Sequence, residues 1–264
     1  MKEQLWKNIS AVREKSPLVQ SITNYVVMNS TANALLAVGA SPIMAHAHQE
    51  MNDMVSIIGA LVVNIGTLDD YWVKSMRMAI AQANLLGKPW VLDPVGAGAT
   101  PYRNEVLEEL LSLRPTIVRG NASEILSLAS NHSTRTKGVD STHHSVEAMD
   151  AAKVLNQHFG SVVCISGATD IIVSGDQVIR LSNGHPLMAR VTGMGCTATA
   201  LTGAFVAVQP DAPFEATVSA MSLLGVAGEL AAENSAGPGS LQVNVLDVLH
   251  TLNENEFIKR IKIS

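Results

Sequence analysis

Residues 90–98 read Trp-Val-Leu-Asp-Pro-Val-Gly-Ala-Gly, a short apolar run that ends in a carboxylate and a glycine-rich turn. An apolar run of this length is typical of a strand buried on both faces of a parallel sheet. Five similar runs occur along the chain, and most of the six end in Gly, Asn or Asp, at the side of a parallel sheet where ligands bind. The six predicted strands cover residues 18–22, 43–45, 60–65, 90–92, 116–118 and 161–165.

Longer segments with helical periodicity separate these runs, which predicts βαβ units and an α/β fold around a mainly parallel sheet. Residues 170–174 and 177–181 alternate around Ser-Gly-Asp and predict a hairpin, hence a short antiparallel edge. Three helices are expected to close the chain, with no internal repeat or linker, so residues 1–264 are predicted to form a single domain. These helices cover residues 196–208, 213–233 (with Asp211 as its N-cap) and 241–253, the last after the breaker Gly237-Pro238-Gly239.

The chain of 264 residues is 47% hydrophobic but only 16% charged, against about 25% charged in an average soluble domain. The deficit is concentrated in residues 16–49 and 191–210, which contain no Asp, Glu, Lys or Arg, so part of these segments must be hidden from water. The net charge is −5 and no Lys/Arg run exceeds two residues, which disfavours nucleic acid as a partner.

Two cysteines and the absence of an apolar signal at the first residues favour a reducing cytoplasm. The longest apolar stretch, residues 197–208, is shorter than the ~20 residues that cross a bilayer, so no membrane association is expected.

Residues 191–197 read Val-Thr-Gly-Met-Gly-Cys-Thr and form a Gly-X-Gly turn that opens directly into an uncharged helix. Such a turn brings backbone N–H groups and the helix dipole toward an anion. Cys196 lies in the first turn, where the dipole is expected to lower the pKa of its thiol and make it reactive. The alternative is a small packing residue, which is our interpretation of Cys164 within its apolar run.

Two further clusters follow predicted strands. Asp93 is placed to hold Mg²⁺ or to order a phosphate. Arg119 can bind phosphate oxygens, and Asn121 is a candidate cap for the helix that carries Glu124. Glu124 is either a functional carboxylate or an ordinary first-turn acid. An anion site, an arginine, two carboxylates and a candidate base are the groups that phosphoryl transfer requires.

Further segments extend this pattern over nearly the whole chain, and with it the sequence resembles the hydroxyethylthiazole kinases of the ribokinase-like superfamily. These segments are Gln-Ser-Ile-Thr-Asn-Tyr-Val at 20–26, Ala-Asn at 32–33, Ser-Pro-Ile-Met at 41–44 and Asn-Ile-Gly-Thr at 64–67. The resemblance implies a ribokinase-like three-layer α/β/α fold. It also implies that ATP, with Mg²⁺, phosphorylates the primary hydroxyl of 4-methyl-5-(2-hydroxyethyl)thiazole in thiamine biosynthesis or salvage.

The resemblance also assigns residues. Cys196 stands where most ribokinase-like enzymes have Asp, and it is implied to accept the alcohol proton. Gly193 and Gly195 are implied to form the anion hole with Cys196, and Met44, Asn24 and Gly193 to bind the thiazole. Arg119, Ser166 and Asn121 are implied to bind ATP, and Asp93 and Glu124 to bind the metal. Ser166 replaces the expected Thr and keeps its hydroxyl.

Because a thiol is mostly protonated at neutral pH, Cys196 is expected to be a weaker base than Asp and to serve positioning more than proton removal. A hydroxymethylpyrimidine kinase is the second interpretation, but it is expected to carry Asp at position 196. A non-catalytic thiazole- or nucleotide-binding regulator would predict a damaged anion hole, and a metal-dependent hydrolase would use His46 and His48.

The polar, aperiodic residues 131–144 predict a surface loop, whose histidine pair is a weaker candidate for a metal site. A small ligand cannot cover the 34 uncharged residues from 16 to 49, so part of that segment is predicted to be buried against a neighbouring subunit. The resemblance implies a homotrimer with sites at subunit boundaries.

Overall fold

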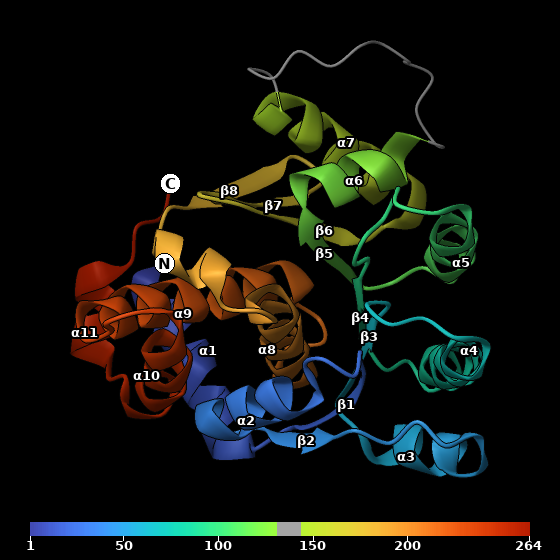
Figure 1. The fold of residues 1–264 in the computed structure, drawn as a ribbon, viewed down its shortest axis with the longest axis horizontal. Coiled ribbons are helices and arrows are strands. Elements are labelled where there is room, and N and C mark those ends of the chain that lie inside the picture. The colour runs from blue at the N-terminus through green and yellow to red at the C-terminus, as the bar shows by residue number, and fades with distance from the viewer. Residues whose placement is uncertain (131–143) are drawn as a thin grey trace.

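A computed structural model describes residues 1–130 and 144–264 (Figure 1). Its strands are β1 (Leu18–Ile22), β2 (Ser41–Ile43), β3 (Ala60–Asn64), β4 (Trp90–Asp93), β5 (Ile117–Asn121), β6 (Val162–Ser166), β7 (Asp170–Ser174) and β8 (Gln177–Leu181). They form one sheet in the order β2-β1-β3-β4-β5-β6-β7-β8. Strands β1 to β6 are parallel and β7 and β8 are antiparallel, which confirms the mainly parallel sheet and the antiparallel edge.

Helices cover both faces of the sheet and make three layers (Figure 1). One face packs against α3 (Met51–Ile57), α4 (Asp70–Leu85), α5 (Pro101–Ser112), α6 (Ala122–Ser130) and α7 (His144–Phe159). The other packs against α1 (Lys2–Lys15), α2 (Met28–Val38), α8 (Met194–Val208), α9 (Pro213–Glu233), α10 (Pro238–Thr251) and α11 (Glu254–Arg260). Two short 3₁₀ segments, His48–Glu50 and Pro186–Arg190, complete the described elements.

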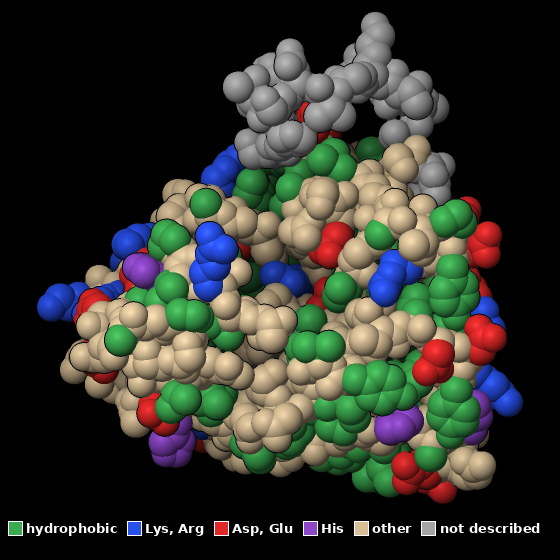
Figure 2. All heavy atoms as spheres, in the orientation of Figure 1, with side chains coloured by type: hydrophobic (Ala, Val, Ile, Leu, Met, Phe, Trp, Pro, Cys, Tyr) green, Lys and Arg blue, Asp and Glu red, His purple; other side chains and the backbone are tan. Residues whose placement is uncertain are grey.

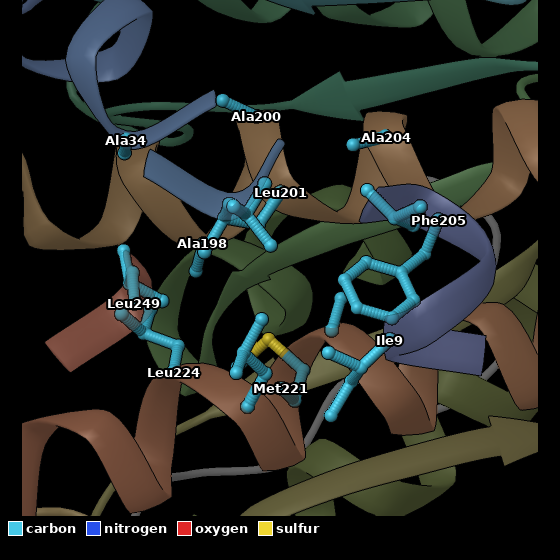
Figure 3. Packing of buried hydrophobic residues seen from close by; sticks show 14 of the residues in the cluster. Ile9, Ala34, Ala198, Ala200, Leu201, Ala204, Phe205, Met221, Leu224 and Leu249 are labelled. Atoms are coloured by element: carbon cyan, nitrogen blue, oxygen red, sulfur yellow. The ribbon is translucent and has the colours of Figure 1, made fainter. Parts of the chain in front are cut away.

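Strand residues alternate between the two layers because successive side chains point to opposite faces. Val62 and Val91 join the core that contains α8, whereas Leu61 and Leu92 join the core beneath α4 and α5. Figure 3 shows the first core, where Phe205 of α8 lies beside Ile9 of α1, with Met221 of α9 nearby. Burial on both faces explains why the strand runs in the sequence are continuously apolar.

The uncharged segment 191–210 forms α8, the central helix of one layer. Every residue from 197 to 206 is buried, which confirms that part of this segment is hidden from water. Helix α9 is the described helix that is long and apolar enough to cross a bilayer by length and composition, but 89% of its apolar window is buried. Its apolar composition is that of a core helix.

Side-chain caps fix where two helices near the functional edge begin. Thr100 Oγ1 accepts a hydrogen bond from Arg103 N, and Pro101 supplies a first helical residue that needs no N–H acceptor. Asp69 Oδ1 accepts from Trp72 N at the start of α4 in the same way. These caps set the first turn of α5 beside the loop that follows β4.

The structure corrects several predicted boundaries. Strand β2 begins and ends earlier than predicted, because beyond Ile43 the Ala45 carbonyl accepts from the side chain of Gln20 instead of pairing in the sheet. The predicted strand 116–118 extends to Asn121, because its pairing with β6 continues to Asn121 opposite Ser166.

The end of the chain differs more. Helix α9 has Ala212, not Asp211, as its N-cap, because Pro213 starts the helix without a side-chain cap. Helix α10 begins at Pro238, three residues earlier than predicted. A further helix, α11, follows it and begins where the Asn253 side chain accepts from Glu256 N, so the prediction of three closing helices missed one of the four described.

The last residues return to the antiparallel edge. Ser264 and Arg180 exchange backbone hydrogen bonds of 3.0 and 2.8 Å, and Ser182 N donates to Lys262 O. The predicted loop at 131–144, with its candidate metal site, lies outside the described residues apart from His144, the first residue of α7.

Candidate active site at the carboxyl ends of the strands

The parallel strands all end at one edge of the sheet, and their polar residues meet there. Asn64 of β3 is in register with Asp93 of β4, and Asn121 of β5 is in register with Ser166 of β6. Figure 2 shows this face of the molecule hollowed near its middle, with basic and acidic side chains inside the hollow. The predicted clustering of groups beyond the strand ends is therefore present.

Asp93 is a carboxylate that is almost wholly buried. Asn64 Nδ2 donates to its Oδ2 at 2.7 Å, and Thr199 Oγ1 of α8 donates to the same oxygen at 2.8 Å. No hydrogen bond from the described residues reaches Oδ1. Burial raises the pKa of Asp93 to about 6, although the positive charge of Arg119 and the two donors oppose the shift.

A chain of amides connects this carboxylate to Cys196. Asn24 Nδ2 donates to Asn64 Oδ1 at 2.9 Å and lies 3.6 Å from the Cys196 sulfur. Backbone N–H groups fix the orientation of both amides, since Gly66 N donates to Asn64 Oδ1 and Val26 N donates to Asn24 Oδ1. Both NH₂ groups therefore face the thiol and the carboxylate.

The Gly-X-Gly turn brings the start of α8 against Arg119. Gly193 has a backbone φ of +81°, which residues with a side chain rarely adopt. Gly195 lies against Arg119, since a Cβ at this position would be 2.8 Å from Arg119 Nη1. Within the described part of the chain, the N–H groups of Gly195 and Cys196 have no acceptor, whereas Thr197 N donates to Gly193 O. The turn thus presents two free N–H groups beside a guanidinium, as the predicted anion site requires.

The predicted lowering of the pKa of Cys196 is wrong. Burial raises the pKa of its thiol, and the nearby charge of Asp93 raises it further. The amides of Asn64 and Asn24 and the charge of Arg119 lower it, but they do not reverse the shift. Desolvation and a neighbouring carboxylate therefore favour the neutral form, and the thiol is protonated at neutral pH.

A cavity of about 640 Å³ opens next to the turn. Arg119, Ser166 and Gly195 line one part of it, and apolar side chains such as Met221 and Leu224 line another. Arg119 is 9% exposed, and its Nε has no hydrogen-bond partner among the described residues. The cavity therefore has an arginine with an unpaired donor in one part and apolar walls elsewhere. This lining suits a ligand that carries both an anionic group and an aromatic ring.

Asn121 and Glu124 cap each other at the start of α6. Glu124 N donates to Asn121 Oδ1 at 3.0 Å, and Asn121 N donates to Glu124 Oε2 at 2.8 Å. The other Glu124 oxygen accepts from Gly96 N at 3.0 Å. The predicted cap by Asn121 is confirmed, and Glu124 uses both oxygens to hold backbone.

Met44 and the two histidines lie nearer the β2 edge. Met44 follows β2, is half-buried and does not line the cavity. His46 Nδ1 contacts the Met44 carbonyl and its ring stacks on Trp72. His48 Nε2 contacts the Tyr71 carbonyl and its ring stacks on Tyr71, so ring stacking and backbone contacts account for both histidines.

Two site residues were not predicted. Asn64 lies within the predicted strand 60–65 and ends β3, and its position opposite Asp93 depends on a register that one sequence does not reveal. Asp170 was interpreted only as the start of a hairpin, yet it lines the cavity and accepts a hydrogen bond from Gly167 N at 3.0 Å. Its closeness in sequence to Ser166 was the available signal.

The fold and the site define a ribokinase-like kinase. A ribokinase-like superfamily protein from Enterococcus faecalis V583 superposes with a TM-score of 0.66 over 91% of this chain and 88% of its own; at 13% identity the likeness shows the fold alone. The model of the hydroxyethylthiazole kinase family matches residues 9–255, and the chain belongs to that family.

Individual relatives agree with this assignment. A hydroxyethylthiazole kinase from Syntrophus aciditrophicus (strain SB) is 54% identical, covering 99% of this chain and 97% of that protein. The solved structure of a hydroxyethylthiazole kinase protein from Pyrococcus horikoshii OT3 is 44% identical, with a TM-score of 0.92 over 99% of this chain and 98% of its own.

Asp170 generates a pH prediction. Burial raises its pKa to about 6, against the opposing effects of the Gly167 N–H and Arg119. Because the folded chain binds this proton more tightly than the unfolded chain, stability is lost as the pH rises from about 4 to about 6. Asp170→Asn removes this titrating group. Its free energy of unfolding relative to the wild type should therefore increase by up to roughly 3 kcal/mol between about pH 4 and about pH 6, and it should not change further at higher pH.

Denaturant unfolding at several pH values from 4 to 8 measures this difference, and other titrating groups cancel between the two proteins. Asp176→Asn, which removes an exposed carboxylate from the same hairpin, is the control for the loss of a charge there. A constant difference for Asp170→Asn would contradict the shifted pKa.

Proposed function

We propose that this chain transfers the γ-phosphoryl group of ATP to the primary hydroxyl of 4-methyl-5-(2-hydroxyethyl)thiazole, with Mg²⁺ as the cofactor. The observation that carries the proposal is the Gly193–Cys196 turn, whose free N–H groups lie against Arg119 at the end of the cavity. The names of the relatives at 54–56% identity support the thiazole as substrate. In phosphoryl transfer, such preorganised donors stabilise the charge on the transferring group.

We also assign a binding region to each of the two substrates. Arg119 and Ser166 face the cavity, which we assign to ATP together with the neighbouring Asn121. Asn24 and Cys196 are not among the residues that line this cavity, and we place the thiazole alcohol beside them, in contact with Gly193 and Met44. The acceptor hydroxyl then approaches the phosphoryl group between the sulfur and the free N–H groups.

The donor set at Asp93 fits Mg²⁺. Its Oδ2 is held by two donors and Oδ1 accepts no hydrogen bond from the described residues, so we assign Asp93 as the carboxylate that binds the cation. A Mg²⁺ ion held by Asp93 would supply positive charge that neutralises the phosphates of ATP. Glu124 already holds two backbone N–H groups, so we assign it to shaping the metal region rather than to direct coordination.

Cys196 holds and orients the acceptor hydroxyl in this proposal. Its thiol is protonated at neutral pH, and in a loose transition state the acceptor oxygen keeps its proton until late. The two free cysteines of the chain agree with the reducing cytoplasm that we assign as its location.

The central experiment is an ADP-release assay with the purified protein, ATP, Mg²⁺ and hydroxyethylthiazole. We expect ADP release that depends on the thiazole and on Mg²⁺. The same assay with hydroxymethylpyrimidine tests the alternative that the chain is a hydroxymethylpyrimidine kinase. We expect at most weak turnover of that alcohol. The absence of thiazole-dependent ADP, with ATP still bound, would leave a binding regulator as the better description.

A second prediction concerns position 196. Cys196→Asp should keep substantial kinase activity, because Asp also accepts a hydrogen bond from the hydroxyl and is the stronger base. Cys196→Ala should lose activity in part, about tenfold, because only the positioning contact is removed. Steady-state kinetics of both variants test this, with ATP affinity as the control. An inactive Cys196→Asp that is folded and binds ATP would contradict the role of position 196 in holding the acceptor hydroxyl.

We further infer a homotrimer with sites at subunit boundaries. In the uncharged segment 16–49, Tyr25, Val26 and Leu36 are large hydrophobic side chains that are 61%, 64% and 58% exposed. Tyr25 and Val26 follow Asn24 directly, so a subunit that covered them would also enclose the thiazole end of the site. Large exposed apolar side chains such as Tyr25 and Val26, adjacent in sequence, are typical of association surfaces.

Light scattering at micromolar concentration measures the assembly, and we expect the mass of three chains. Val26→Glu should shift it toward the monomer, because a carboxylate would be buried in the contact, whereas Val243→Glu, exposed on α10, should not. A monomeric wild type would refute the trimer.

A further inference from the structure

Arg103 of α5 joins two loops of the site through backbone carbonyls. Its Nη1 donates to Ile65 O at 2.6 Å and to Val95 O at 2.9 Å, and its Nη2 donates to Gly66 O at 2.9 Å. The carbonyls of 65 and 66 follow β3, and the carbonyl of 95 follows β4. Among the described residues Arg103 has no carboxylate partner within ion-pair distance, so its charge is devoted to these two loops.

Glu124 holds the same loop from the opposite side. The Val95 carbonyl and the Gly96 N–H belong to one peptide unit, and Gly96 N donates to Glu124 Oε1 at 3.0 Å. A guanidinium therefore binds the negative end of this peptide dipole while a carboxylate binds its positive end. Charge-assisted hydrogen bonds of this kind are about twice as strong as neutral ones, and together they fix the orientation of the peptide.

The two loops carry the groups at the reacting end of the site. Asp93 lies two residues before the held peptide. Gly66 lies against Asn24, since a Cβ on Gly66 would come within 2.5 Å of Asn24 Nδ2, and Gly66 N orients Asn64. By contrast, no residue of either loop lines the cavity that we assign to ATP.

We propose that Arg103 is a positioning residue for phosphoryl transfer. With Glu124 it holds the Val95–Gly96 peptide, and through Gly66 it holds the amides that face Cys196, without touching either substrate. The proposal rests on the kinase function proposed above. A loss of this contact should lower kcat and leave the KM for ATP nearly unchanged.

The test compares Arg103→Met and Arg103→Lys with the wild type. We expect Arg103→Met to reduce kcat by about tenfold or more, because small displacements of reacting groups are costly, while the KM for ATP stays within about twofold. Arg103→Lys keeps the charge without the fork that reaches both loops, so it should recover part of kcat. Arg77→Met is the matched control. Arg77 of α4 is exposed and pairs with Glu109 of α5 at 2.6 Å, so this substitution removes one positive charge beside α5 and leaves both loops held.

Amide hydrogen exchange gives a readout that does not depend on activity. Faster exchange in a peptide spanning residues 94–99 of Arg103→Met, with protection elsewhere and melting temperature close to those of Arg77→Met, supports the proposal. Wild-type kcat in Arg103→Met, or reduced kcat with unchanged exchange at residues 94–99, overturns it. If Arg103→Met does not fold, the same two measurements on Arg103→Lys decide.

If the wild type shows no kinase activity, the proposed function is refuted, but the loop-holding contact of Arg103 is not. In that case the exchange comparison still shows whether Arg103 holds the loop, so the two failures remain distinct.

Discussion

The buried carboxylate of Asp93 is the constraint on which the site depends. A charge removed from water requires donors, and Asn64 and Thr199 supply them from β3 and from α8. The same two bonds tie the central strands to the helix that carries the Gly-X-Gly turn. The position of Cys196 is therefore coupled to the position of Asp93, through Asn24 and Asn64 on one side and through α8 on the other.

The fold was largely predictable because its two main signals are local. Continuous apolar runs indicated the parallel strands, and alternation around Ser-Gly-Asp indicated the hairpin at 170–181. The errors occurred where long-range contacts set the boundary. Gln20 ends the pairing of β2 by binding the Ala45 carbonyl, and strand β5 extends to Asn121 only because β6 lies beside it.

The sequence indicated which polar residues meet beyond the strand ends, but not the electrostatics of the thiol. Arg119, Gly195 and Cys196 do meet, as their positions after strands and at a helix start indicated. The expected acidic thiol was wrong because the helix dipole is a local property, whereas burial and the charge of Asp93 come from tertiary structure. Asn64 and Arg103 were missed for a related reason, since nothing in one sequence shows which carbonyls a guanidinium will reach.

The return of the last residues to β8 has a consequence for association. A long, exposed edge strand offers unpaired N–H and C=O groups that can template pairing with another chain. Here Leu181 of β8 pairs with Ile263, and the opposite edge strand, β2, is only three residues long. The C-terminal residues therefore cover the end of β8, and β2 is short, so both edges of the sheet offer little open backbone for edge-to-edge pairing with another copy.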